Sequence, residues 1–238
     1  MPLFGLGYQH VYYQGYFSKY RLHRLFTYRF ELPGNLKFAE NFCRRLEKRG
    51  FKVRLIDERK LRKELSIYTD LSNICFANHP LWSKRDAVED HELFFSFRRF
   101  VKNENLLIAE YHGKPVGFLL WFPDFNELRK SNRSFKMGRF GADVLRYRLQ
   151  NHIKTIRLAE IGILPEFQKK GVDALLFSDF IKRARRRNYR HGEGGFIFEQ
   201  NTVSHAMARR YLERISGTKH GPYRTFGVFM KELANEKD

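Results

Sequence analysis

Apolar and polar residues alternate along several short stretches, and this pattern predicts the strands of a sheet. Two of these stretches, residues 106–111 and 116–122, flank a His-Gly-Lys-Pro turn and form the strongest hairpin signal in the chain. Both arms are apolar enough to lie in the middle of a sheet. Further strands are expected at 27–32, 51–56, 155–164, 195–199 and 223–231.

Apolar residues spaced three and four positions apart predict helices between these strands. The clearest example runs from Leu61 through Leu65, Tyr68 and Leu71, and Asp57 is placed to cap its start. Other helices are expected at 36–50, 86–101, 172–188 and 201–214, and a helical stretch at 142–150 lies within a polar, basic connection.

The order of these elements predicts an α/β fold with one mixed sheet flanked by helices. An antiparallel hairpin early in the chain distinguishes this order from doubly wound nucleotide-binding folds. Residues 51–238 are interpreted as the main domain. Residues 1–50, rich in tyrosine and phenylalanine, are interpreted as an accessory segment packed on that domain; the alternative is a loosely attached aromatic arm.

Composition favours a folded protein that works in the cytoplasm. Hydrophobic residues make up 42% of the 238 residues, with 24 Phe and 12 Tyr, so disorder is not expected. No apolar run is long enough to span a membrane, and the first 15 residues do not resemble a signal peptide. Cys43 and Cys75 are the only cysteines, and the histidines lack metal-ligand spacing, so we expect neither disulfide nor metal.

The net charge of +19 predicts attraction to polyanions. Its densest part is residues 182–191, Lys-Arg-Ala-Arg-Arg-Arg-Asn-Tyr-Arg-His. This basic patch could bind a nucleic-acid backbone or the adenosine 3′-phosphate of coenzyme A. The alternative is a solvated helix end, where positive charge is favourable in any case.

The stretch from Glu160 to Leu176 carries the most specific chemistry. A strand leads through a Pro-marked turn into Gln168-Lys-Lys-Gly171, and a helix begins directly after this loop. Unpaired amides at a helix N-terminus, together with two lysines, form a natural site for phosphate. Asp173 does not suit a phosphate site, because its negative charge would face the anion unless the side chain turns away. A basic turn without a ligand is the alternative.

These features together resemble the GNAT superfamily of N-acyltransferases. The resemblance rests on the order of elements, the Gly-Lys-Pro-Val-Gly hairpin and the run from Ile163 to Gly171. Members carry Gln/Arg-x-x-Gly-x-Gly/Ala where backbone amides hold the pyrophosphate of acetyl-coenzyme A. Gln168 and Gly171 match, whereas Asp173 stands where the family has a small residue. The likeness, to an uncharacterised bacterial subgroup, covers roughly residues 50–233.

The resemblance implies a set of site residues. Those implied to bind acyl-coenzyme A are Ile161, Gly162, Ile163, Gln168, Lys169, Lys170, Gly171, Val172, Asp173 and Asn201. Glu160 is implied as the base that deprotonates an amine, unless it turns outward or pairs with Arg157. Asn201 could simply cap its helix. Tyr211 could protonate the leaving thiolate, although core packing suits it better, and Tyr223 is a weaker second candidate.

The sequence therefore predicts an enzyme that transfers an acetyl or other acyl group directly from acyl-coenzyme A to an amine, on a small molecule or a protein, without a metal. The rival hypothesis is an inactive GNAT-like basic module that binds RNA, a ribosome or another polyanion. An open cleft between strands next to Gly171 would favour the first.

Overall fold

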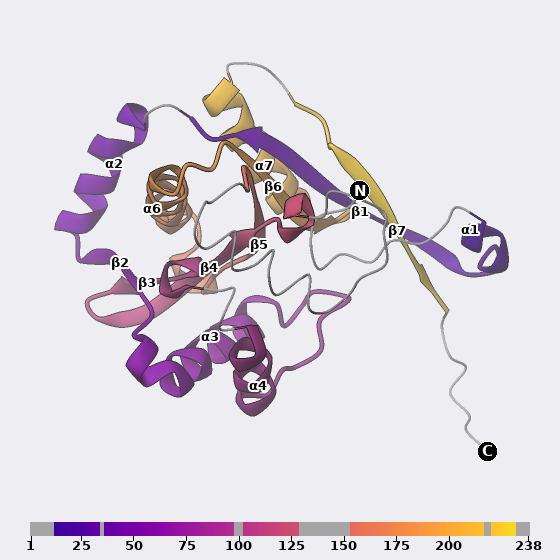
Figure 1. Cartoon of the computed structure of the whole chain (residues 1–238), viewed down its shortest axis with the longest axis horizontal. Helices are drawn as coiled ribbons and strands as arrows, with labels where there is room; N and C mark the ends of the chain where they lie inside the picture. The colour runs from indigo at the N-terminus through magenta and orange to yellow at the C-terminus, as the bar shows by residue number, and fades with distance from the viewer. Residues whose placement is uncertain (1–11, 34–35, 98–101, 129–152, 217–219, 232–238) are drawn as a thin grey trace.

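Seven strands form one mixed sheet in the computed structural model, which describes residues 12–33, 36–97, 102–128, 153–216 and 220–231. Their order across the sheet is β2-β3-β4-β5-β6-β1-β7 (Figure 1). All neighbouring pairs run antiparallel except β5 and β6. The strands are β1 (Arg21–Glu31), β2 (Phe51–Leu55), β3 (Leu106–Tyr111), β4 (Lys114–Pro123), β5 (Thr155–Ile163), β6 (His191–Phe198) and β7 (Arg224–Met230).

Helices cover both sides of this sheet. On one side, here the α6 side, α2 packs beside α6, and α7 contributes side chains to the same core. On the other, the α3 side, α3 contacts β4 and β5 and carries α4 against it (Figure 1). The helices are α1 (Tyr13–Tyr16), α2 (Lys37–Lys48), α3 (Leu61–Cys75), α4 (Ala87–Phe97), α6 (Val172–Arg186) and α7 (Thr202–Ser216). Within the described ranges, no helix is both long and apolar enough to cross a membrane.

The alternation of β4 divides the core into two layers. Leu119 and Trp121 are buried on the α6 side, whereas Phe118 and Leu120 are buried on the α3 side. Successive side chains of a strand point to opposite faces, so an apolar strand in the middle of a sheet fills both layers. The predicted central position of the hairpin is thus confirmed.

The hairpin turn itself follows from two residues. His112 and Gly113 both have positive φ angles, 46° and 78°. A two-residue turn with this geometry matches the twist of antiparallel strands, and glycine adopts it without strain. The helical stretch expected at 142–150 lies outside the described residues.

The N-terminal segment supplies a strand to the main sheet. β1 pairs with β6 through residues 25–31 and with β7 through residues 21–27. Residues 21–24 pair with β7 alone, so the two strands continue past the rest of the sheet as a ribbon (Figure 1). The division of the chain at residue 50 stays a prediction, but residues 21–31 lie inside the sheet.

Candidate active site

The two parallel strands in the middle of the sheet separate part of the way along. β5 pairs with β6 only from Thr155 to Leu158, whereas its pairing with β4 continues to Ile163. The β4–β5 register shifts at Leu120/Trp121, which leaves Ala159 as an extra residue on β5. Such a bulge bends a strand and interrupts its pairing. The edge of β5 beyond residue 158 therefore faces an opening instead of β6.

Backbone groups of β5 are directed into this opening. The Leu164 N–H donates to the Val116 carbonyl of β4 at 3.0 Å. Because alternate residues of an antiparallel strand bond to the same neighbour, Ile161 and Ile163 direct their N–H and C=O groups away from β4. In agreement, the Gln168 side-chain amide donates to the Ile163 carbonyl at 3.2 Å. Gly162 leaves room for packing instead, because a Cβ at this position would lie 2.4 Å from the Phe118 ring.

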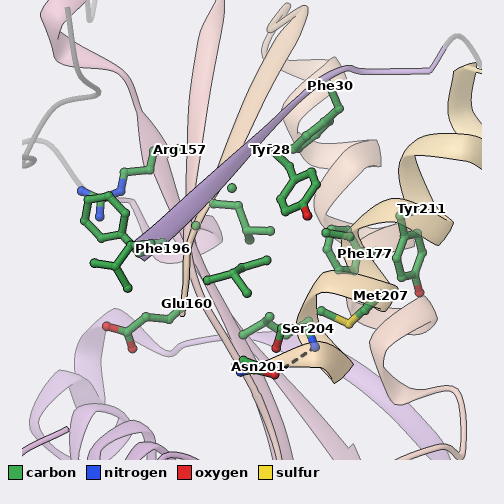
Figure 2. Close-up of a pocket in the computed structure, with 18 of the residues that line it drawn as sticks. Tyr28, Phe30, Arg157, Glu160, Phe177, Phe196, Asn201, Ser204, Met207 and Tyr211 are labelled. Carbon is green, nitrogen blue, oxygen red and sulfur yellow. Dashed lines mark hydrogen bonds between the residues drawn. The ribbon is translucent and has the colours of Figure 1, made fainter. Parts of the chain in front are cut away.

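A cavity of about 360 Å³ fills the opening and reaches both sides of the sheet. Figure 2 shows Glu160, Arg157 and Phe196 on one side of the strands, and Tyr28, Phe177 and Tyr211 on the other. Most of the lining is apolar. β5 and β6 thus separate to form a cavity, as the enzyme hypothesis requires. The cavity lining does not include residues 168–173, the loop that contains Gly171.

Glu160 enters the cavity from β5 on the α3 side. The Tyr68 hydroxyl of α3 donates to Oε2 at 2.6 Å, and Arg85 Nη1 lies 3.4 Å from Oε1. Its side chain is 26% exposed. Glu160 is therefore held in place by two donors while remaining accessible. The charge of Glu160 also acts on Arg157, the partner considered from the sequence.

The donors to Glu160 belong to a buried polar network. Arg85 also donates through Nε and Nη2 to Asp90 of α4, at 2.9 and 2.5 Å, and Thr69 donates to the other oxygen of Asp90 at 2.5 Å. Burial, together with the charge of Glu160, raises the pKa of Tyr68 well above its ordinary value. Tyr68 therefore keeps its proton and remains a donor to Glu160.

The loop before α6 has the shape of an anion site. Gly171 is the N-cap of this 15-residue helix, with φ of 88°, and it offers no side chain that could cap the first turn. Gln168, Lys169 and Lys170 are exposed beside it. The amides of the first turn and the positive end of the helix dipole thus meet two lysines.

The backbone conformation also favours glycine at position 171. A Cβ there would lie 2.5 Å from the Phe42 ring of α2, and the positive φ would strain any larger residue. The Gly171 signal is therefore less specific for phosphate than the sequence pattern suggests. Val172 points its side chain into the core, where it is fully buried, so only its backbone faces the loop.

Asp173 and Tyr211 contact each other across α6 and α7. The Tyr211 hydroxyl donates to Asp173 Oδ2 at 3.2 Å, and its ring stacks on Phe177 with centroids 4.4 Å apart. Burial and the nearby Asp173 raise the pKa of Tyr211, which makes it a weaker acid. The Asp173 carboxylate thus has a partner on α7. Tyr211 packs against the core, as the sequence favoured, and also lines the cavity, so its role as an acid stays a prediction.

Asn201 caps α7, since its Oδ1 accepts the Ser204 N–H at 3.0 Å (Figure 2). This confirms the capping role, and Asn201 also lines the cavity. Tyr223 does not line it; its hydroxyl accepts from Arg29 at 3.0 Å.

Sequence reasoning missed several polar residues of the site. Tyr68 was read as one apolar position in a helical stripe, and Arg85 lies in a connection without a motif. Tyr28, on β1, lines the cavity and donates to His205 Nδ1 at 2.9 Å. His205 accepts there because its other nitrogen, Nε2, lies 3.2 Å from the Phe198 carbonyl, which can only accept. Residues so far apart in the chain give no local signal.

The basic patch 182–191 is partly neutralised. Arg183 pairs with Asp179 at 2.5 Å, and Arg187 with Glu104 at 2.7 Å. Tyr189 is buried, so it offers no ring for a base to stack on. These contacts favour a solvated helix end, and nucleic-acid binding there stays a prediction.

A family model described as the acetyltransferase (GNAT) family matches residues 68–212, which is more than half of the chain. The chain therefore belongs to the GNAT family of acetyltransferases. The match includes α3 from Tyr68 onward, the hairpin, β5, the loop before α6 and most of α7. A search of curated proteins finds no significant match.

Solved structures share the fold at low identity. A GCN5-related N-acetyltransferase from Sphaerobacter thermophilus is 12% identical, with 92% of this chain and 54% of that chain covered and a TM-score of 0.53. A glucosamine N-acetyltransferase region of a fungal multi-domain GH3 β-N-acetylglucosaminidase is 12% identical, with 91% and 22% covered and a TM-score of 0.54. The chain thus spans about half of the first protein and about a fifth of the second.

A third structure was solved with its cofactor acetyl-CoA. It is a Salmonella typhimurium protein described as a candidate acetyltransferase, 18% identical, with 68% of this chain and 78% of that chain covered and a TM-score of 0.43.

Proposed function

We propose that this protein transfers an acyl group from acyl-coenzyme A directly to the nitrogen of an amine. The observation that carries the proposal is the separation of β5 from β6, which opens a cavity through the sheet. An amine and a thioester can meet there from opposite sides, each in contact with a different set of helices. Holding two reactants in one geometry can lower the barrier by about 7 to 11 kcal/mol.

The chain's own groups fit an acyl-coenzyme A molecule. The backbone of Ile161 and Ile163 can bond an extended amide-containing arm, as a neighbouring strand would. The amides at the start of α6, with Lys169 and Lys170, suit a pyrophosphate. Coenzyme A itself supplies the activated thioester. Because residues 168–173 do not line the cavity, the arm has to run along β5 to connect the two places.

Glu160 is the base in this proposal. An ammonium must lose a proton before its nitrogen can attack, and Glu160 is the carboxylate that β5 brings into the cavity. Tyr68 and Arg85 each occupy one position on its oxygens, and a carboxylate has further lone pairs to accept from an amine or a bridging water.

Direct transfer is preferred over a covalent acyl-enzyme. A cysteine must be a thiolate to take the acyl group. Burial raises the pKa of Cys75 to about 12 and also raises that of Cys43, so both remain protonated near neutral pH. These are the only cysteines in the chain.

Intact-mass spectrometry with acetyl-coenzyme A tests the proposal. Protein incubated with acetyl-coenzyme A alone is expected to gain no covalent acetyl group on either cysteine. Adding a mixture of amines is expected to release free coenzyme A, detected with a thiol reagent, in step with acetylated amine. A stable cysteine adduct would overturn direct transfer, and no amine-dependent release would overturn the transferase function.

A further inference from the structure

The α3-side half of the cavity is walled by aromatic rings around one carboxylate. Phe76 and Trp82, from the end of α3 and the segment after it, lie with ring centroids 4.8 Å apart. Phe196 of β6 lies on the same side of the strands as Glu160 (Figure 2). His79 also lines this half, and burial lowers its pKa, so it is neutral near pH 7. The walls thus offer apolar surface with few charges.

Two arginines lie close to Glu160, and carboxylates offset the charge of both. Arg85 pairs with Asp90 as well as with Glu160, and the charges of Glu160, Asp124 and Glu193 act on Arg157. Arg85 also stacks over Trp82 at 5.3 Å from the ring centroid. Arg157 lines the cavity and lies over the Phe122 ring at 5.4 Å. Positive charge near a bound amine favours its neutral form, which is the nucleophile. The net charge of +19 disfavours the approach of acceptors that carry several ammonium groups.

From these two features we infer that the acceptor is a monoamine on an aromatic or similarly apolar body, bound between Trp82 and Phe196 with its nitrogen at Glu160. The inference rests on the proposed transfer function and names its substrate class. A polyamine would leave its further ammonium groups without partners against the rings, and an amino sugar would leave its hydroxyl groups without partners there.

Phe196 is the residue assigned to specificity. It is 37% exposed and contacts Phe226 edge-on, with centroids 4.7 Å apart, so its loss leaves the core intact. Removing one ring that contacts a bound aromatic group is expected to raise KM for that group roughly tenfold. Because Phe196 lies apart from the loop before α6, KM for acetyl-coenzyme A is expected to stay the same.

The test measures coenzyme A release by the full chain with acetyl-coenzyme A and phenethylamine, spermidine or glucosamine. We expect kcat/KM for phenethylamine to exceed the other two by at least about tenfold. Phe196→Ala is expected to raise KM for phenethylamine roughly tenfold, with kcat and KM for acetyl-coenzyme A within about twofold. Val88→Ala, on the exposed side of α4, is the matched control and is expected to change neither kcat nor the KM for either substrate.

The outcomes separate the inference from the function on which it rests. Equal or faster turnover of spermidine or glucosamine would overturn the inference and leave the transferase function standing. An unchanged KM for phenethylamine in Phe196→Ala would also overturn it. No release with any amine would contradict the proposed function and the inference with it.

Discussion

Replacing Glu160 with glutamine is expected to lower kcat/KM for amine acetylation by about 10²- to 10³-fold, the loss typical of a general base. Glutamine keeps the size of the side chain and can still accept from the Tyr68 hydroxyl, so the fold should persist. It cannot take a proton from an ammonium. Steady-state release of coenzyme A at saturating acetyl-coenzyme A measures the effect.

Glu166→Gln provides the matched control for this substitution. Glu166 is an exposed carboxylate in the turn that follows β5, and it does not line the cavity. Its replacement should leave kcat/KM within about twofold. If Glu160→Gln retains wild-type activity, Glu160 is not the base, and its carboxylate serves only to hold Tyr68 and Arg85.

Asp90→Ala is expected to destabilise the fold by about 3 kcal/mol, because it removes one partner of a buried ion pair. The Asp90 side chain is 5% exposed and accepts from Arg85 and Thr69. Without it, the largely buried Arg85 guanidinium loses its pairing with Asp90 and retains that with Glu160, and the single proton of the Thr69 hydroxyl is left to the Leu65 carbonyl. Urea unfolding measures the change in the free energy of unfolding.

Glu89→Ala removes an exposed carboxylate from the adjacent position of α4. Its effect should stay within about 0.5 kcal/mol, as is usual for surface substitutions. Equal effects of the two substitutions would show that the Arg85–Asp90 pair contributes no more than a surface charge. Asp90 would then not hold Arg85 in place beside Glu160.

Local patterns were sufficient to predict most of the fold. The hairpin at 106–122, the helix at 61–75 and the strand–loop–helix step at 155–186 each follow from periodicity and turn residues within one stretch. β6 was expected only from residue 195, yet it begins at His191. Its glycine-rich start has little strand propensity of its own and is a strand because β5 and β1 pair with it on both sides.

The site was harder to predict, because its contacts join distant parts of the chain. Glu160 was chosen from its place before the loop, but its partners Tyr68 and Arg85 come from elements about 75 to 92 residues away. The Phe42 contact at Gly171 and the Asp173–Tyr211 bond likewise depend on how helices pack. Spacing along the sequence carries no information on such contacts.

The most direct test of the central claim is isothermal titration of the full chain with acetyl-coenzyme A, comparing two double charge reversals, one just before α6 and one near its C-terminal end. Lys169→Glu with Lys170→Glu alters the loop before α6, and Lys182→Glu with Arg186→Glu alters exposed charges near the other end. We expect the wild-type protein to bind and the loop variant to bind at least about tenfold more weakly, since it places negative charge beside a pyrophosphate at a helix N-terminus. The second variant should bind within about twofold of the wild type. No binding by the wild type, or equal weakening in both variants, would contradict a coenzyme site at this loop.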